Sequence, residues 1–321
     1  MTSRLLAIAL MPLPHLAAAE WERLASLPEP VGGCVHGAVG GAIVIAGGTN
    51  WEGGEKHWLD RIRAYDPRTN AWRDAGRLDA PLAYAVSAED AGDFYFASGS
   101  TGTATHRALW KMSADFSVKK IAALDAGFVY AGGAIVGRTL YVVGGSDDQA
   151  RYERFGKALL AISLDTGATE RLADYPEAAF SIGAVAACGG GIHVFGGARW
   201  DAAADAVANM SAAHAYSLAE KRWKPLPPLP RANRGIGAVT LDERHILLAG
   251  GYTSEPEEFT AATYLFDTTL GTYTPSKPLP WAGMVGLVKS GDWLYCIAGE
   301  DAKAHRTDAM FRIRWRELLV P

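Results

Sequence analysis

The sequence predicts an all-β protein built from six copies of a four-stranded unit, and three repeated features support this. A doublet of small residues follows an apolar run six times, in VIAGG, YFASG, YVVGG, HVFGG, LLAGG and YCIAG. The doublets recur about every 50 residues, a period typical of one propeller blade per repeat. Their second residues are Gly48, Gly99, Gly145, Gly197, Gly251 and Gly299.

Paired aromatic residues downstream of several doublets are the second feature. Tyr65 precedes Trp72, and the pairs Tyr216–Trp223 and Phe266–Tyr273 have the same spacing. The turns between them, DPRTN, SLAEK and DTTLG, are rich in residues that adopt turn geometry at low cost. We expect two outer strands joined by a hairpin, with the aromatic side chains packed between neighbouring blades.

Small residues upstream of the doublets are the third feature. Triplets such as Gly37-Ala38-Val39 and Gly133-Ala134-Ile135 suit an innermost strand, because backbones crowd together near the axis of a radial array. The repeats therefore predict a six-bladed β-propeller, which resembles the Kelch family of propellers over residues 20–321 as a single domain.

The N-terminal segment predicts how this ring closes. Trp21 and Leu27 repeat the spacing that ends the fourth strand elsewhere, yet no blade of their own precedes them. We expect residues 20–27 to supply the outer strand of the last blade, which removes the open edge of the ring.

Residues 1–19 have the pattern of a signal peptide. Arg4 precedes the apolar stretch LLAIALMPLPHL, which ends at Ala17-Ala18-Ala19. Cleavage near Ala19 predicts a periplasmic or secreted protein, and the alternative is an N-terminal arm. No other segment is long and apolar enough to predict a membrane span.

Composition excludes several classes of site. The net charge of −4, without basic runs, argues against nucleic-acid binding. Cys34, Cys188 and Cys296 lack disulfide or zinc spacing, and Cys188 and Cys296 are expected to be buried thiols. The eight histidines are scattered and no dinucleotide or phosphate-binding motif occurs, so we expect neither a metal nor a cofactor.

The segments that follow the doublets are expected to share one end of the propeller, where binding residues usually lie. Trp51, Trp58 and Trp200 lie on two long segments there, and either stack on sugar rings or cover blade ends. Arg154, Arg231 and Arg234 are further candidate ligand contacts. We expect the segments that carry them to lie beside the mouth of the central channel of the propeller.

Glu300 stands out because the equivalent positions of the other five repeats carry Thr, Ser, Ser, Ala and Tyr. A partly desolvated carboxylate can act as an acid or base, and Arg306 can bind a ligand carboxylate through two parallel hydrogen bonds. The alternative interpretations are a structural Glu–Arg ion pair and simple decay of the repeat.

The run GEDAKAHRTD (299–308) resembles the Gly-Glu-…-Arg-Thr-Asp segment of the bacterial sialic acid mutarotases, also called N-acetylneuraminate epimerases, which are periplasmic Kelch propellers. The segment GGTNWEGGEKHWLDRIRAYD (47–66) resembles the long loop of the cyclically permuted branch of that family. The resemblance implies that Glu300 and Arg306 are the functional pair.

The resemblance also implies an activity, the interconversion of the anomers of N-acetylneuraminate or a related sugar acid by acid/base ring opening. Glu300 would be the acid/base group and Arg306 would hold the substrate carboxylate, with Arg154, Arg231, Arg234 and Trp51 as further contacts. The competing hypothesis is a non-catalytic Kelch propeller that binds a glycan or protein.

Overall fold

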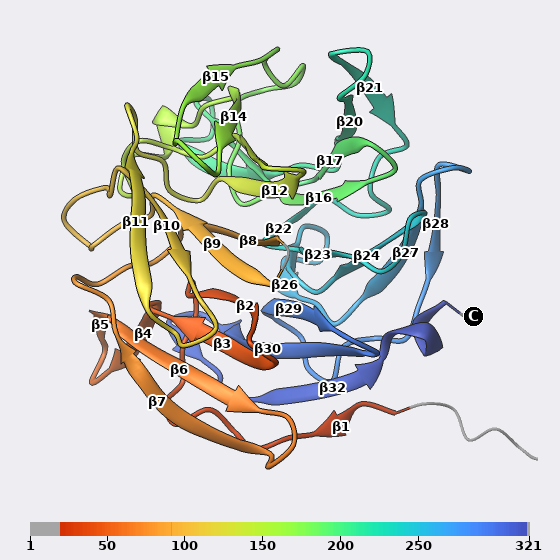
Figure 1. The fold of residues 1–321 in the computed structure, drawn as a ribbon. Coiled ribbons are helices and arrows are strands. Elements are labelled where there is room, and N and C mark those ends of the chain that lie inside the picture. Colours follow the sequence, from red (N-terminus) through yellow and green to blue (C-terminus); the bar gives the residue numbers. More distant parts are fainter. Residues whose placement is uncertain (1–19, 91, 320–321) are drawn as a thin grey trace, which may run out of the picture.

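The computed structural model describes residues 20–90 and 92–319, which fold almost entirely into antiparallel β-strands (Figure 1). The predicted signal peptide, residues 1–19, lies outside the described residues. In the described part, two short 3-10 helices are present, η1 (Tyr152–Arg154) and η2 (Trp315–Leu318). No helix among these residues has the length and apolar character needed to cross a membrane.

Six sheets within residues 20–90 and 92–319 share one plan, in which four antiparallel strands lie side by side. The first three are β2 (Val35–Val39), β3 (Ala42–Ala46), β6 (Arg61–Asp66) and β7 (Ala71–Arg77); β8 (Val86–Asp90), β9 (Asp93–Ala97), β10 (Ala108–Met112) and β11 (Val118–Ala123); and β12 (Gly132–Val136), β13 (Thr139–Val143), β14 (Leu159–Ser163) and β15 (Thr169–Arg171). The other three are β16 (Ala184–Cys188), β17 (Gly191–Phe195), β20 (Ala213–Ser217) and β21 (Arg222–Leu226); β23 (Gly237–Thr240), β24 (His245–Ala249), β27 (Thr263–Asp267) and β28 (Thr272–Pro275); and β29 (Met284–Ser290), β30 (Trp293–Ala302), β32 (Met310–Arg314) and β1 (Glu22–Arg23).

Short hairpins follow several of the doublets, on the segments between the second and third strands of these sheets. They are β4 (Thr49–Glu52) with β5 (Glu55–Trp58), β18 (Ala198–Asp201) with β19 (Ala206–Asn209), β25 (Tyr252–Thr253) with β26 (Glu258–Phe259), and the end of β30 with β31 (His305–Arg306). Strand β22 (Asn233–Arg234) pairs with β25 from the preceding link. The long segments predicted from the sequence are therefore ordered hairpins.

Backbone hydrogen bonds from the doublets join each sheet to the next, which explains why the doublets repeat. The second residue of each doublet donates its N–H to a carbonyl at the start of a neighbouring sheet, at 2.7 to 2.9 Å. The pairs are Gly48–Leu82, Gly99–Phe128, Gly145–Phe180, Gly197–Asn233, Gly251–Gly283 and Gly299–Val31. Glycine is needed at this position within its own sheet: Gly299 has φ 113°, and a Cβ there would lie 1.9 Å from the carbonyl oxygen of Met284 on the paired strand β29.

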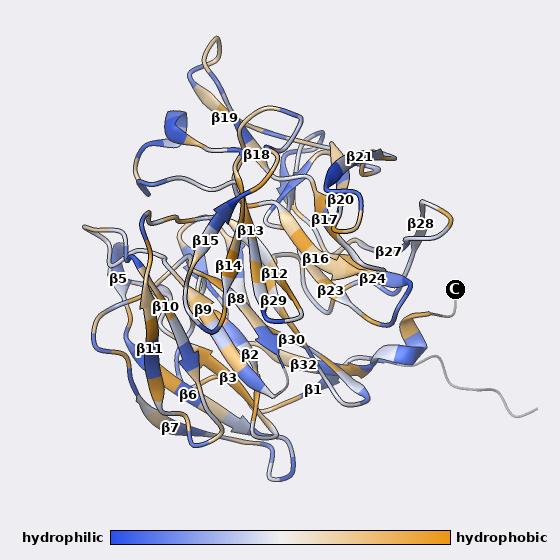
Figure 2. Ribbon diagram, turned by 45° about the horizontal axis from the view of Figure 1, so that its top comes forward, coloured by the Kyte–Doolittle hydropathy of each residue, from blue (hydrophilic) through white to orange (hydrophobic). Residues whose placement is uncertain are grey.

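The first strands of the sheets contact one another in succession. Contacts run from β2 to β8, β12, β16, β23 and β29, and β29 also contacts β2. Figure 2 shows hydrophobic colour on inner strands such as β12 and β16. The all-β architecture of small antiparallel sheets fits a propeller.

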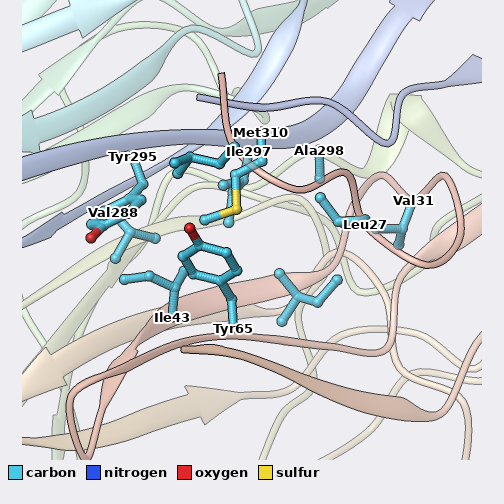
Figure 3. Packing of buried hydrophobic residues seen from close by; sticks show 11 residues of the cluster. Leu27, Val31, Ile43, Tyr65, Val288, Tyr295, Ile297, Ala298 and Met310 are labelled. Carbon is cyan, nitrogen blue, oxygen red and sulfur yellow. The ribbon is translucent and has the colours of Figure 1, made fainter. Parts of the chain in front are cut away.

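The N-terminal strand pairs with the last part of the chain, as predicted. β1 is shorter than residues 20–27, with Glu22 opposite Arg312 and Arg23 opposite Phe311. The N–H of Leu24 donates to Met310 at 2.9 Å and that of Leu27 to Asp308 at 2.8 Å, which extends the pairing. Figure 3 shows the buried cluster at this junction, where residues near both ends of the chain pack together.

The aromatic residues bridge neighbouring sheets, which confirms their predicted place. Side-chain donors on four equivalent residues bond to carbonyls of the adjacent sheet or link, at 2.8 to 3.0 Å. The pairs are Trp21–Pro278, Trp72–Ala25, Trp223–Ala173 and Tyr273–Pro227. Cys188 and Cys296 are buried, also as predicted.

Candidate functional site

A cavity of about 600 Å³ is lined by the hairpins that follow the doublets and by the segments that lead into the first strand of each sheet. Its aromatic lining residues are Trp51, Tyr84, Tyr130, Tyr152, Tyr252 and Phe259. Its charged lining residues are Lys56, Arg234, Glu300, Lys303 and Arg306. A smaller cavity of about 280 Å³ shares part of this lining and continues along the first strands of the sheets.

The structure brings four of the six predicted site residues together. Glu300, Arg306, Arg234 and Trp51 all line the larger cavity. The Trp51 indole nitrogen is buried and has no hydrogen-bond partner among the described residues, so this donor is unsatisfied.

Arg154 and Arg231 do not line this cavity, and each is engaged elsewhere. Arg154 forms an ion pair with Asp147. Arg231 lies 3.8 Å from the Glu258 carboxylate and donates to the Glu255 carbonyl at 3.0 Å. Other residues form the walls of this cavity. Contacts of Arg154 and Arg231 with a ligand remain predictions.

Glu300 and Arg306 face each other across the hairpin formed by β30 and β31. They are direct partners in the register, and Nη1 of Arg306 lies 2.7 Å from Oε2 of Glu300. The Glu300 side chain is 31% exposed, whereas that of Arg306 is only 5% exposed. The ion pair considered as an alternative is therefore present, and it forms part of the cavity wall.

Arg306 is held by several neighbours. Its Nη2 donates to the Thr49 hydroxyl at 3.4 Å, and that hydroxyl also lies 3.4 Å from the Tyr84 hydroxyl. Gly32 leaves room for the guanidinium, because a Cβ there would lie 2.5 Å from Cδ and 2.7 Å from Nε of Arg306. Buried Nε has no partner among the described residues, so one donor of Arg306 is unsatisfied.

A row of residues with left-handed backbone conformation forms part of the cavity wall. They occupy the position after each inter-sheet link and have φ between 54° and 66°: Gly33, Tyr84, Tyr130, Ile182 and Gly235. Each N–H from Tyr84 onward donates to the carbonyl of the preceding member, at 2.8 to 3.1 Å. Such conformations are costly for Tyr and especially for Ile, and strained backbone of this kind concentrates at functional sites.

Tyr84 and Tyr130 form an aromatic surface in this row. Their ring centroids lie 4.6 Å apart, and Trp58 contacts Tyr84 edge-on at 5.7 Å. The Lys56 ammonium lies 4.9 Å from the Tyr84 ring centroid, a cation–π arrangement. Burial is the main cause that raises the pKa of Tyr130, and the neighbouring Tyr84 adds to it. The Tyr130 phenol therefore stays a neutral hydrogen-bonding group at physiological pH.

Cys34 and His36 contribute uncharged groups to the wall. Burial raises the pKa of the Cys34 thiol to about 12, so it is a poor nucleophile. Burial also lowers the pKa of His36, which favours its neutral form.

The charges of the lining favour an anionic ligand. Lys56, Arg234, Lys303 and Arg306 face one carboxylate, Glu300, so formal positive charges outnumber negative ones by four to one. A cavity lined mostly by aromatic and apolar groups strengthens such charge–charge attraction relative to water. Within residues 20–90 and 92–319, no three His, Cys, Asp or Glu side chains converge as metal ligands.

Sequence reasoning missed Tyr84, Tyr130, Tyr152 and Tyr252 as lining residues. A signal for the first two was present, because Tyr84 and Tyr130 stand at the same repeat position as Gly33 and Gly235. The feature that these positions share is a left-handed backbone conformation, which residue types as different as Gly and Tyr adopt here, so residue type alone does not reveal it.

Comparison with known proteins supports the repeat assignment. Residues 30–78 match the family model described as the Kelch motif. A search of curated proteins finds no significant match. The Kelch motif and the many small antiparallel sheets together support a Kelch-repeat fold for this chain.

Proposed function

We propose that the six sheets are the blades of a closed propeller, sealed by the N-terminal strand. Two observations support this. The doublet hydrogen bonds link the sheets in succession and end with Gly299 bonded to Val31, and the first strands contact one another from β2 through β29 and back to β2. Pairing of β1 with β32 would give the last blade its fourth strand and join the two ends of the chain in one sheet.

We infer that the protein is a mutarotase that interconverts the anomers of a sialic acid or a related sugar acid. The observation that carries this proposal is the Glu300–Arg306 pair in the wall of a cationic, aromatic-lined cavity. The resemblance of GEDAKAHRTD to the sialic acid mutarotases indicates the type of reaction. The excess of positive charge in the cavity lining favours a sugar that carries a carboxylate.

The chemistry requires only proton movement. Glu300 accepts the proton of the anomeric hydroxyl, whose oxygen becomes the carbonyl oxygen of the open chain. The bond between the anomeric carbon and the ring oxygen breaks, and the ring oxygen takes that proton back from the Glu300 carboxyl group. The open-chain keto acid rotates about the bond next to its carbonyl, and the reverse steps close the ring on the other face. Because protons are conserved over the cycle, one acid/base group at the cavity wall suffices.

We further propose that residues 1–19 direct export, which would place the protein in the periplasm or outside the cell. The pattern of Arg4, an apolar stretch and three alanines supports this. Mass spectrometry of the exported protein tests it, since a mature chain that still begins at Met1 would contradict it.

A second candidate function is glycan binding without catalysis. The adjacent rings of Tyr84 and Tyr130, tilted by 45°, and the unpartnered indole nitrogen of Trp51 favour it, because aromatic faces with nearby donors suit sugar rings. This protein would bind the sugar acid but leave its anomers unchanged.

Proton NMR of freshly released α-anomer of N-acetylneuraminate, with and without the protein, tests the proposed function. The expected result is equilibration with the β-anomer faster than the spontaneous rate, in proportion to protein concentration. Equilibration at the spontaneous rate for N-acetylneuraminate and related sugar acids would overturn the mutarotase proposal. Retained binding in the same samples would then favour the glycan-binding function.

A further inference from the structure

Arg234 is held in the cavity wall by two neutral groups. Its Nη1 donates to the side-chain oxygen of Asn209 at 2.7 Å, and its guanidinium carbon lies 4.5 Å from the ring centroid of Tyr252. Asn209 is itself fixed, because its amide donates to the Tyr252 carbonyl at 2.9 Å. Strands β22 and β25 pair Arg234 directly with Tyr252, so the guanidinium and the ring share one backbone frame.

No carboxylate in the described residues balances this charge. Arg234 forms no ion pair among residues 20–90 and 92–319, and its Nε and Nη2 make no hydrogen bond there. The nearby Glu258 carboxylate lies 3.8 Å from Arg231 instead. A guanidinium fixed by an amide and a ring, with two donor atoms left over, is preorganised for an anion.

Arg306, in contrast, already has a carboxylate partner. Its side chain is 5% exposed, and Nη1 and Nη2 already contact Glu300 and Thr49. A ligand carboxylate would have to displace Glu300 to reach Nη1 of Arg306. The geometry therefore makes Arg306 a positioning residue for Glu300 and leaves Arg234 to meet the ligand.

We propose that Arg234, Asn209 and Tyr252 form the carboxylate subsite of the cavity. The subsite takes the planar carboxylate of a sugar acid on Nε and Nη2 of Arg234, while the ring of the sugar extends toward Glu300. This inference rests on the proposed function for the identity of the sugar, and on the contacts of Arg234 for the recognition of the carboxylate. It replaces Arg306 as the carboxylate anchor that the resemblance implies.

Binding of N-acetylneuraminate and of its uncharged methyl ester, measured by calorimetry, tests the subsite. The variants are Arg234→Gln, Asn209→Asp and, as a control, Arg222→Gln, each checked for folding by circular dichroism. Arg222 lies on β21, pairs with Glu220 and does not line the cavity. Asn209→Asp keeps the arginine but places a carboxylate against its guanidinium, so it tests the charge without removing Arg234.

The expected result is that Arg234→Gln and Asn209→Asp each weaken binding of the acid by about tenfold or more. Binding of the ester should change by less than about twofold, because the ester lacks the charge that the subsite recognises. Arg222→Gln should leave both affinities unchanged. Asn209→Asp provides the test if Arg234→Gln does not fold.

Three results would overturn the subsite: unchanged acid binding in both variants, equal loss of acid and ester binding, or a wild-type protein that does not prefer the acid. Anomer equilibration measured on the same samples separates this inference from the proposed function. A wild-type protein that prefers the acid through Arg234 but does not accelerate equilibration would refute the mutarotase and leave the subsite standing.

Discussion

Nη1 of Arg306 lies 2.7 Å from Oε2 of Glu300, and the same two residues are direct partners across the hairpin of β30 and β31. The backbone register thus sets the distance between their side chains. A structural ion pair and a functional pair are usually treated as alternatives. Here the buried guanidinium can orient the carboxylate whose other oxygen is available to a ligand, so one contact serves both purposes.

Glu300→Gln should separate binding from catalysis. Gln keeps an oxygen that can accept from Arg306 but cannot take a proton from a sugar hydroxyl. We expect anomer equilibration to slow by about a hundredfold or more, with ligand binding retained. NMR of the anomer ratio over time and calorimetry measure the two quantities.

The matched control for this variant is Glu52→Gln. Glu52 is exposed at the end of β4 on a neighbouring hairpin, and it does not line the cavity. It should equilibrate anomers at the wild-type rate. Full activity in Glu300→Gln would remove Glu300 from the mechanism.

The repeat features could be predicted from the sequence because their physical cause is local. Each doublet must place its second residue close to the next sheet, and each paired aromatic must reach a neighbouring carbonyl, as Trp72 reaches Ala25. These requirements recur in every sheet, so the same residue types recur at similar spacing. Trp21 has the same role, since its indole donates to the Pro278 carbonyl, and its spacing from Leu27 therefore predicts the pairing of β1 with the last sheet.

The cavity was less predictable because it depends on the register of the first strands. The triplets that begin at Gly37 and Gly133 belong to inner strands but occupy different positions in them, opposite Val44 and Val142. The triplets therefore do not reveal that Tyr84 and Tyr130 occupy equivalent positions. The partners of Arg234 and Arg306 come from hairpins whose conformations no repeat spacing encodes.

Gly32→Ala should disturb Arg306 without touching Glu300. The added Cβ would lie 2.5 Å from Cδ of Arg306, so the buried side chain must shift and the ion pair must lengthen. The backbone of Gly32 does not need glycine for its own conformation, since its φ lies outside the left-handed region. We expect slower anomer equilibration and a loss of about 1–3 kcal/mol in the free energy of unfolding.

Gly156→Ala is the control for this substitution, because a Cβ there would meet its nearest atom at an ordinary 3.6 Å. It should retain activity and most of its stability. A crystal structure of Gly32→Ala that keeps the Arg306–Glu300 contact unchanged would contradict the role of Gly32.

Leu27→Ala tests whether the N-terminal strand completes the last sheet. Leu27 is 4% exposed and belongs to the cluster shared by the first and last sheets. Truncation of a buried leucine costs about 2–5 kcal/mol. We therefore expect a loss of that size in the free energy of unfolding, measured with urea.

Leu229→Ala provides the comparison, since Leu229 has the equivalent place in a sheet formed by consecutive segments and is 5% exposed. The two substitutions should cost similar amounts. A negligible cost for Leu27→Ala beside a large one for Leu229→Ala would show that the N-terminal segment is detached in solution.

His193 predicts a pH dependence of stability. The side chain is 6% exposed, its Nδ1 has no partner among the described residues, and burial lowers its pKa from 6.5 to about 4. The unfolded chain therefore binds this proton at a higher pH than the folded protein does. Above pH 6.5 this residue does not lower the free energy of unfolding. As the pH falls toward 4, protonation of the unfolded chain lowers the free energy of unfolding by roughly 3 kcal/mol in total.

His193→Phe should remove this component, because phenylalanine does not titrate and the neighbouring rings of Phe195 and Phe266 accommodate an apolar side chain. Urea unfolding at pH 7.5 and pH 4.5 measures the difference in the free energy of unfolding. We expect the difference to shrink by about 2 kcal/mol relative to wild type. The exposed His57→Gln is the control for loss of a histidine. An equal acid-induced loss in His193→Phe and wild type would mean that other groups cause the pH dependence.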